Sequence, residues 1–399
     1  MEQRIELYTP HQNQRLIHDS INNDPYKYYV LDIGRQFGKT LLADNQALYW
    51  AFNDPKCKIG WVSPIYKQVK KVYDEIEQSL ISSGYFAEHN KTELYLKTIN
   101  GSSIQFFSAE RYDNIRGFTF DYLICDEFAF MDEQAWTEVL RATVIVKGKK
   151  VLLISTPKGK NHFYRMYQLD GTNPQYKSFK MTSYDNPIIN PQEIDDARLT
   201  LPEHVFRQEY LAEFVDSGTE LFTNLTIKND ALRTNKMYAG IDLGRADDYT
   251  VLTILNDKGQ MFYCERWRHD SWTNIVLKLT DRLNQYKPVT EVEINSIGDA
   301  IYEQIKLLFH GELYPFVTSS KSKSDIIESL IVGNQSKEFT IQDIDWLKKE
   351  FDVFTYQYSA QTRSVKYGAP NGFHDDGIMS CAIAYHSFKK RLHPANNFF

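Results

Sequence analysis

The stretch that decides the fold is YYVLDIGRQFGKT, residues 28–40. Its apolar run ends at Ile33, and a glycine-containing turn at residues 34–38 leads into a segment from Lys39 to about Phe52 with apolar residues at helical spacing. A turn placed between a strand and a helix lets backbone N–H groups surround phosphates, and the helix N-terminus adds positive potential. The stretch therefore predicts a strand, a phosphate-binding turn and a helix.

The turn also carries the side chains that a nucleotide site needs. Lys39 would reach the terminal phosphates of ATP, and the Thr40 hydroxyl would bind Mg²⁺. The common P-loop pattern has its first glycine where this chain has Ile33, and Gly34 lies one place later. Gly-Lys-Thr alone occurs often by chance, so its context decides the interpretation. The residues predicted to bind the nucleotide in this turn are Gly34, Arg35, Gln36, Phe37, Gly38, Lys39 and Thr40.

Two further strand ends support an ATP site. An apolar run over residues 122–125 leads into Asp126 and Glu127. Asp126 would hold Mg²⁺ through water, and Glu127 would polarise the attacking water. An isolated Asp-Glu would instead be a surface pair after a core strand. A third run ends in the residues Ser155-Thr156-Pro157, a position that lies beside the γ-phosphate in motor ATPases, although alone it is only a strand end before a proline.

The C-terminal half offers a different set of acidic residues. Asp242 lies in an apolar strand that opens a β-hairpin set, Glu293 ends a later strand, and Asp375-Asp376 precede the last helix. Burying a lone carboxylate costs free energy, and a bound metal ion would offset that cost. Hard oxygen ligands suit Mg²⁺ or Mn²⁺ better than zinc. Asp247 and Asp248 fall in a turn, where solvent exposure is the default.

Length and composition fit two globular domains. The 399 residues, 42% hydrophobic and 25% charged, alternate strand and helix signals in two runs, which predicts α/β folds. We expect residues 1–215 to form one domain, 216–235 a linker and 236–399 a second domain. A net charge of −6 argues against a general nucleic-acid coat protein but not against an enzyme with a local basic surface. The four scattered cysteines predict reduced thiols, and no signal core or membrane-length apolar run appears, so we expect a cytosolic protein.

The order of these motifs resembles the large terminase subunit of tailed double-stranded-DNA bacteriophages. That family often replaces the first P-loop glycine and carries Arg-Gln before the final Gly-Lys-Ser/Thr, as Arg35 and Gln36 do here. Pro10-His11-Gln12 resembles the upstream adenine-recognition motif, in which Gln12 would contact the base; a helix-surface glutamine is the alternative. The resemblance makes Arg116, in Ile115-Arg116-Gly117, a candidate arginine finger toward a neighbouring subunit. A salt bridge is as good an explanation, and Arg35 is a rival for the role.

The resemblance implies an N-terminal P-loop ATPase of the ASCE type with three layers, followed by an RNase H-like nuclease. Asp242, Glu293 and Asp376 would hold the nuclease metals, with Asp376 favoured by the family's His-x-Asp pattern and Asp375 as a flanking or alternative ligand. The protein would push double-stranded DNA through the portal into a procapsid in the host cytoplasm and cut concatemers. It would work as a ring, commonly of five subunits, with a small terminase subunit and the portal protein, and it could be a monomer in solution.

Two other functions stay open at this stage. One is a helicase-nuclease for repair or transposition, although the C-terminal half has a carboxylate set in place of a second motor domain. The other is a non-catalytic DNA-binding or docking protein, which intact motif residues argue against. DNA contacts are expected through the backbone of the duplex. Their candidate residues lie in two segments expected to be loops and are Lys321, Lys323, Arg363 and Lys366.

Overall fold

The computed structural model describes residues 8–215, 221–222, 224–244, 248–268, 271–294, 298–359, 364–370 and 372–392. By their contacts these residues form two compact units. The first contains the chain up to Ala197 and resumes at His204, and the second takes residues Arg198–Glu203 and the chain beyond the junction. Within the expected linker, residues 216–220 and 223 lie outside the described residues.

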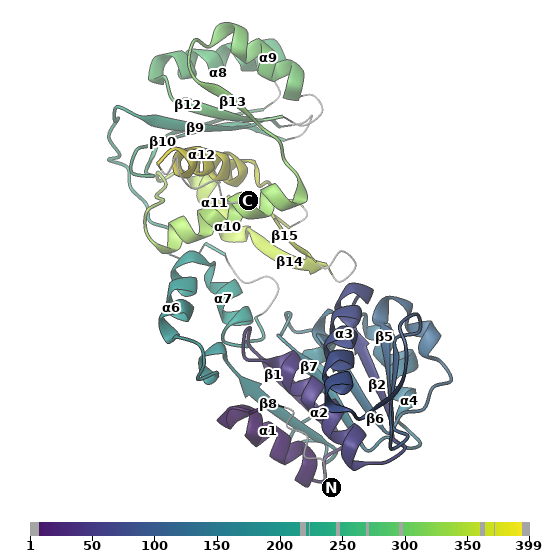
Figure 1. Cartoon of the computed structure of the whole chain (residues 1–399). Coiled ribbons are helices and arrows are strands. Elements are labelled where there is room, and N and C mark those ends of the chain that lie inside the picture. Colours follow the sequence, from purple (N-terminus) through teal and green to yellow (C-terminus); the bar gives the residue numbers. More distant parts are fainter. Residues whose placement is uncertain are drawn as a thin grey trace. The chain divides into compact units, whose positions relative to one another are not determined.

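The first unit is built on an eight-stranded sheet (Figure 1) with the order β3-β4-β5-β2-β6-β7-β1-β8. Strands β5, β2, β6, β7, β1 and β8 are parallel, and β3 and β4 form an antiparallel edge. Strands β1, β6 and β7 follow the sequence-based expectation, whereas β3, β4 and β8 were not expected because polar residues interrupt their apolar ones. The strands are β1 (Tyr28–Ile33), β2 (Lys58–Ser63), β3 (Phe86–Asn90), β4 (Tyr95–Thr98), β5 (Ser103–Ser108), β6 (Tyr122–Asp126), β7 (Lys150–Ser155) and β8 (Tyr176–Met181).

Helices cover both faces of this sheet, so the unit has three layers (Figure 1). Alternate residues of each strand enter opposite cores: Leu31 packs in the core under the three N-terminal helices, and Val30 packs in the core on the other face. The helices and helical turns are α1 (Gln12–Asn23), α2 (Lys39–Asn53), α3 (Tyr66–Ser83), η1 (Ala109–Ile115), η2 (Phe128–Phe130), η3 (Ala135–Leu140), α4 (Arg141–Thr143), α5 (His162–Tyr167), η4 (Ser183–Asp185), α6 (Pro191–Thr200) and α7 (Glu203–Glu209).

The second unit has a five-stranded sheet with the order β11-β10-β9-β12-β13. Antiparallel β9, β10 and β11 are followed by β12 and β13, which run parallel to β9. Helices α8 and α9 lie on one face, and α12 packs against β9 on the other (Figure 1). The elements are β9 (Met237–Asp242), β10 (Thr250–Asn256), β11 (Met261–Trp267), α8 (Trp272–Tyr286), β12 (Val289–Glu293), α9 (Gly298–Leu308), β13 (Leu313–Phe316), α10 (Ser320–Gln335), α11 (Asp345–Val353), β14 (Thr355–Ser359), β15 (Ser364–Gly368) and α12 (Asp376–Leu392).

Two expected loops of the second unit are regular structure instead. Lys321 and Lys323 lie in the first turn of α10, which Ser319 caps by accepting a hydrogen bond from the Ser322 N–H. Lys366 lies on β15, which pairs with β14 as a hairpin. Serine caps and short polar strands carry little periodicity, and this is why both were taken for loops. Arg363 lies outside the described residues.

The remaining global features are simple. All four cysteines are free, as expected, and three of them are buried. None of the described helices is long and apolar enough to cross a membrane.

Candidate active sites

The phosphate-binding turn has the backbone that its sequence requires. Gln36 and Gly38 both adopt left-handed conformations, with φ of 59° and 94°. Gly38 then caps the N-terminus of α2, so Lys39 is the first residue of the helix. The Lys39 side chain is buried, and its Nζ lies 3.4 Å from the carbonyl oxygen of Gly34. The ammonium group is therefore folded back over the turn, where terminal phosphates would lie.

Side chains from outside the turn bind its carbonyl oxygens. Ser183 Oγ donates to the Arg35 carbonyl and Asn186 Nδ2 donates to that of Gln36, both at 2.7 Å. Gln14 Nε2 donates to the Gly38 carbonyl at 3.3 Å. With these carbonyls held from outside, the shape of the turn is set before a nucleotide arrives.

Strand order brings the second ATPase motif to the first. Strand β7 separates β1 from β6, and this places Asp126 and Glu127 near the turn. The Lys39 ammonium lies 4.0 Å from the Glu127 carboxylate. Ser155, at the end of β7, donates from Oγ to Glu127 Oε2 at 3.2 Å. Glu127 itself has a left-handed φ of 54°, an uncommon conformation that fixes its carboxylate among these partners.

Asp126 has the environment of a cation ligand. Burial, and then the neighbouring Glu127, raise its pKa to about 7, although Lys39 and a hydrogen bond from the Thr40 side chain lower it. One carboxylate oxygen, Oδ1, is buried and has no hydrogen-bond partner among the described residues. A positive ion beside Asp126 would remove both penalties. Thr40 and Asp126 therefore fit a hydrated Mg²⁺.

Asp44 is a second buried acid at this site that sequence reasoning passed over. It lies one turn after Thr40 on α2, it is 7% exposed, and its Oδ1 has no hydrogen-bond partner in the described chain. Burial first and Asp126 second raise its pKa to about 8. Its spacing of four residues from Thr40 was the available signal.

The other predicted ATPase residues differ in their exposure. Gln12 is exposed at the start of α1, whereas Gln14 in the same turn is buried and contacts the phosphate-binding turn. Arg116 is half exposed and paired with Asp113 and Glu138, at 2.8 and 3.4 Å. Arg35 is paired with Glu209, with 2.6 Å between Nε and Oε2. Phe37 is buried, with its ring against His11.

The acidic residues of the second unit come together through strand register. Parallel β9 and β12 pair Ile241 with Val292, so Asp242 and Glu293 are the next residues on the same edge. Burial raises the pKa of Asp242 well above its usual value, and a hydrogen bond with Glu293 adds to that effect. Two carboxylates that share a hydrogen bond must also share a proton, unless a cation takes its place. The pair therefore fits a divalent metal ion.

Helix α12 brings Asp376 to the same cluster. Asp376 is buried, accepts a hydrogen bond from the Tyr249 N–H at 3.0 Å, and adds to the raised pKa of Asp242. Asp248 and His374 lie beside it, and one ligand atom from each of these three residues lies within 4.8 Å of the others. Asp248 is exposed, as a turn residue should be, but it also belongs to the cluster. Asp247 lies outside the described residues.

Asp375 has a different environment from Asp376. Its Oδ2 lies 3.1 Å from the Lys323 ammonium, and its side chain is 28% exposed against 11% for Asp376. An ion pair with a lysine occupies one of its oxygens, whereas Asp376 faces other acids.

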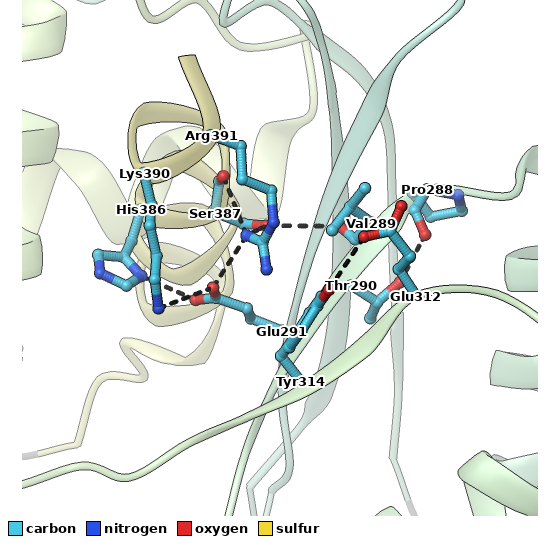
Figure 2. A network of polar contacts seen from close by, with 10 residues as sticks. All are labelled: Pro288, Val289, Thr290, Glu291, Glu312, Tyr314, His386, Ser387, Lys390 and Arg391. Carbon is cyan, nitrogen blue, oxygen red and sulfur yellow. Dashed lines mark hydrogen bonds and ion pairs between the residues drawn. The ribbon is translucent and has the colours of Figure 1, made fainter. Parts of the chain in front are cut away.

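Glu291, two residues before Glu293, is a buried acid with different partners. It is buried, and its carboxylate lies 2.7 Å from His386 Nδ1, 3.0 Å from Arg391 and 4.0 Å from Lys390 (Figure 2). The Arg391 guanidinium also lies 4.4 Å from the centre of the Tyr314 ring. Burial raises the pKa of Glu291, but the hydrogen bonds and charges of His386 and Arg391 outweigh burial and hold it below the usual value. Glu291 is thus neutralised by its own chain.

Known proteins are similar to this chain in sequence and fold. A family model described as "Terminase large subunit, T4likevirus-type, N-terminal" matches residues 30–229. The terminase large subunit of Thermus virus P23-45 is 27% identical over a 433-residue alignment that covers 96% of this chain and 88% of the relative. That of Escherichia phage T5 is 28% identical over 266 residues, covering 62% and 60%. The structure of the large terminase from the thermophilic bacteriophage D6E matches with a TM-score of 0.54 and 14% identity, covering 94% of this chain and 98% of the other.

The fold is that of a P-loop ATPase domain joined to a nuclease domain. The chain belongs to the terminase large-subunit family. It is therefore a DNA-packaging motor subunit with ATPase and nuclease activity, and viral DNA and the procapsid portal are the partners that this role implies. The sequence-based fold class and function are confirmed.

Proposed function

We propose that the first unit hydrolyses magnesium-bound ATP to translocate double-stranded DNA, and that the second unit cuts that DNA with divalent metal ions. The same type of observation supports the ATPase and the nuclease parts of this proposal. In each unit, motif residues from separate strands and helices converge at one edge of a sheet, as Lys39 and Glu127 do at 4.0 Å. The D6E large terminase, whose fold this chain shares, has been solved in complex with ADP.

In the ATPase unit, Lys39 would bind the terminal phosphates and neutralise charge in the transition state. Thr40 and Asp126 would hold Mg²⁺, and Glu127 would orient the attacking water and accept its proton. The Ser155 hydroxyl donates to Glu127 and so fixes the carboxylate that acts on water. We assign nucleotide contacts to Gln12, to the turn residues 34–38 and to the buried Gln14, which ties α1 to the turn.

The choice of an arginine finger also belongs to this proposal. Arg35 is held by the largely buried Glu209, whereas Arg116 is on the surface with two exposed acidic partners. Exposed ion pairs are weak and exchange easily. Arg116 is therefore the better candidate for a neighbouring subunit's ATP in a ring.

In the nuclease unit, Asp242, Glu293 and Asp376 would hold the metal ions, with Asp248 and His374 at the edge of the cluster. The ions supply a nucleophilic water and stabilise the leaving oxygen. Oxygen ligands suit Mg²⁺, and Mn²⁺ would bind the same set. Asp375 is held by Lys323 and takes the flanking role.

The assembly follows from the same family role. We propose a homo-oligomeric ring, with five subunits as the expected number, on the portal of the procapsid in the host cytoplasm, recruited with a small terminase subunit. The isolated chain would be a monomer that assembles on the portal.

Paired active-site variants test the proposal. Lys39→Ala should abolish ATP turnover and leave Mg²⁺-dependent plasmid cleavage intact, and Asp242→Ala should do the reverse. Each variant is the control for the other, because the two sites are in separate units. A wild-type protein that neither cuts nor hydrolyses ATP, even with DNA added, would refute both activities and favour a docking protein.

A further inference from the structure

Beside the nuclease carboxylates is a groove with a volume of about 450 Å³. Its walls combine aromatic rings with cations, and the residues that matter here are Tyr249, Trp346, Phe373, His374, Arg266 and Lys349. The acids of the groove lie close to positive or donor groups of the chain: Asp345 is 3.0 Å from the Lys348 ammonium, and Glu350 Oε2 accepts the Gly377 N–H at 2.8 Å. The groove lies within the second unit.

The Arg266 guanidinium is the central feature of this groove. Its carbon lies 4.2 Å from the centre of the Tyr249 ring and 4.2 Å from that of Trp346. Its side chain is 27% exposed, and it forms an ion pair with the buried Glu350 carboxylate at 3.7 Å, a separation beyond hydrogen-bond length. Within the described chain, Arg266 donates no hydrogen bond, although a guanidinium has five N–H donors.

This arrangement is unusual for an arginine that only supports the fold. Stacking on ring faces restricts the guanidinium to one plane and leaves its N–H edges directed away from the rings. A fixed plane with free donors loses little entropy when it binds a planar or tetrahedral anion in a bidentate way.

The two rings that stack on Arg266, those of Tyr249 and Trp346, both lie next to the carboxylate cluster around Asp376. The Tyr249 N–H donates to Asp376 Oδ2 at 3.0 Å, and the Tyr249 ring packs on His374 with 5.2 Å between ring centres. On the Trp346 side, Glu350 accepts a hydrogen bond from Gly377, the residue after Asp376. A DNA strand whose scissile phosphate reached Asp376 would therefore pass this groove.

We propose that Arg266, held between Tyr249 and Trp346, clamps a DNA phosphate that neighbours the scissile one. Lys349, exposed on α11, supplies a second cation, and the exposed ring of Phe373 offers an apolar surface for the adjoining sugar or base. The site reads no sequence, because phosphate contacts position a duplex without identifying its bases. This inference rests on the proposed nuclease role of the same unit.

The experiment measures binding of a short fluorescein-labelled DNA duplex to the full chain, with Ca²⁺ in place of Mg²⁺ to prevent cutting, over a range of salt concentrations. Arg266→Gln should weaken binding by roughly tenfold or more and reduce the salt slope by about one. Arg233→Gln is the matched control, since Arg233 also lies over a tyrosine ring, that of Tyr286, but donates to backbone carbonyls. The control should change neither quantity.

A second variant separates the clamp from stability. Trp346→Leu leaves the cation in place but removes one wall, and it should weaken binding by a smaller factor with the salt slope unchanged. ATP turnover should match wild type in all three variants, and circular dichroism should show each variant folded at the assay temperature. Wild-type affinity and slope in Arg266→Gln would overturn the proposal, and so would equal losses in Arg233→Gln.

Failure of the clamp proposal can be told apart from failure of the nuclease proposal. Asp242→Ala that still cuts DNA would refute the assigned metal site, whereas the duplex affinity of Arg266→Gln is measured without cleavage. Weak binding in Arg266→Gln together with normal binding in Arg233→Gln is the pattern that supports the clamp.

Discussion

Replacing Gly240 with alanine should disable the nuclease while leaving the ATPase intact. Gly240 is on β9 where α12 crosses, and a Cβ there would lie 2.3 Å from both the Ala384 nitrogen and the Ser380 carbonyl oxygen. Ordinary contact begins at 3.4 Å, so the helix must retreat by about 1 Å, because both obstacles are backbone atoms. Ser380 is one turn after Asp376, so the Asp376 carboxylate moves away from Asp242 with the helix.

The magnitude follows from that displacement. Overpacking of this kind costs about 1–3 kcal/mol of unfolding free energy. A misplacement of about 1 Å at a catalytic centre lowers its rate roughly a hundredfold. The assay is Mg²⁺-dependent plasmid cleavage, with ATP turnover and the melting temperature measured on the same sample.

A matched variant isolates the effect of the added carbon. Ser380→Ala removes the hydrogen bond from Ser380 Oγ to the Gly240 carbonyl, at 3.0 Å, without introducing a clash. It should cut DNA at close to the wild-type rate. Full cleavage by Gly240→Ala with an unchanged melting temperature would show that the helix position does not control the site.

Three further expectations concern single side chains. Ser155→Ala removes the donor to Glu127 and should lower ATP turnover roughly tenfold to a hundredfold at unchanged nucleotide affinity; a change in affinity alone would contradict this. The pKa of Asp44 is raised to about 8 in the folded protein, above its unfolded value of about 3.9. Its contribution to the free energy of unfolding is therefore complete below the unfolded pKa and is lost as pH rises through the folded pKa. In urea titrations without metal, Asp44→Asn should therefore be more stable than wild type near pH 9 and lose less stability between about pH 5 and 9. Arg391→Ala leaves the buried Glu291 with fewer partners and should cost about 1–3 kcal/mol in the second unit, a cost that an exposed surface lysine would not show on removal.

Much of the ATPase site is local in sequence and was predicted from it. Gly38, Lys39 and Thr40 follow one another, and the strand before them and the helix after them are both apolar at the correct period. The ends of parallel strands meet at one edge, and this is why Asp126 and Ser155 were placed in the same site without a structure. The fold class follows from the same alternation of strands and helices.

Other parts of that site depend on contacts that no spacing records. Gln14, Ser183 and Asn186 hold the carbonyls of the phosphate-binding turn, and two of them are about 150 residues away from it in the chain. Polar residues in loops give no periodic signal, so the sequence does not distinguish them from solvent-exposed residues. Strands β3 and β4, mostly polar, were missed for the same reason.

By itself, then, the sequence predicted the two α/β units, the nucleotide-binding turn and the acids Asp242, Glu293 and Asp376, because each sits beside an apolar strand or helix that the sequence shows. Only the tertiary structure decided which partners each acid meets. Glu291 and Glu293 are two residues apart on one strand, yet Glu291 meets Arg391 and Glu293 meets Asp242. The different partners of Glu291 and Glu293 depend on where α12 crosses the sheet. That position is set by packing between α12 and strands far from it in the sequence, and local spacing does not record it.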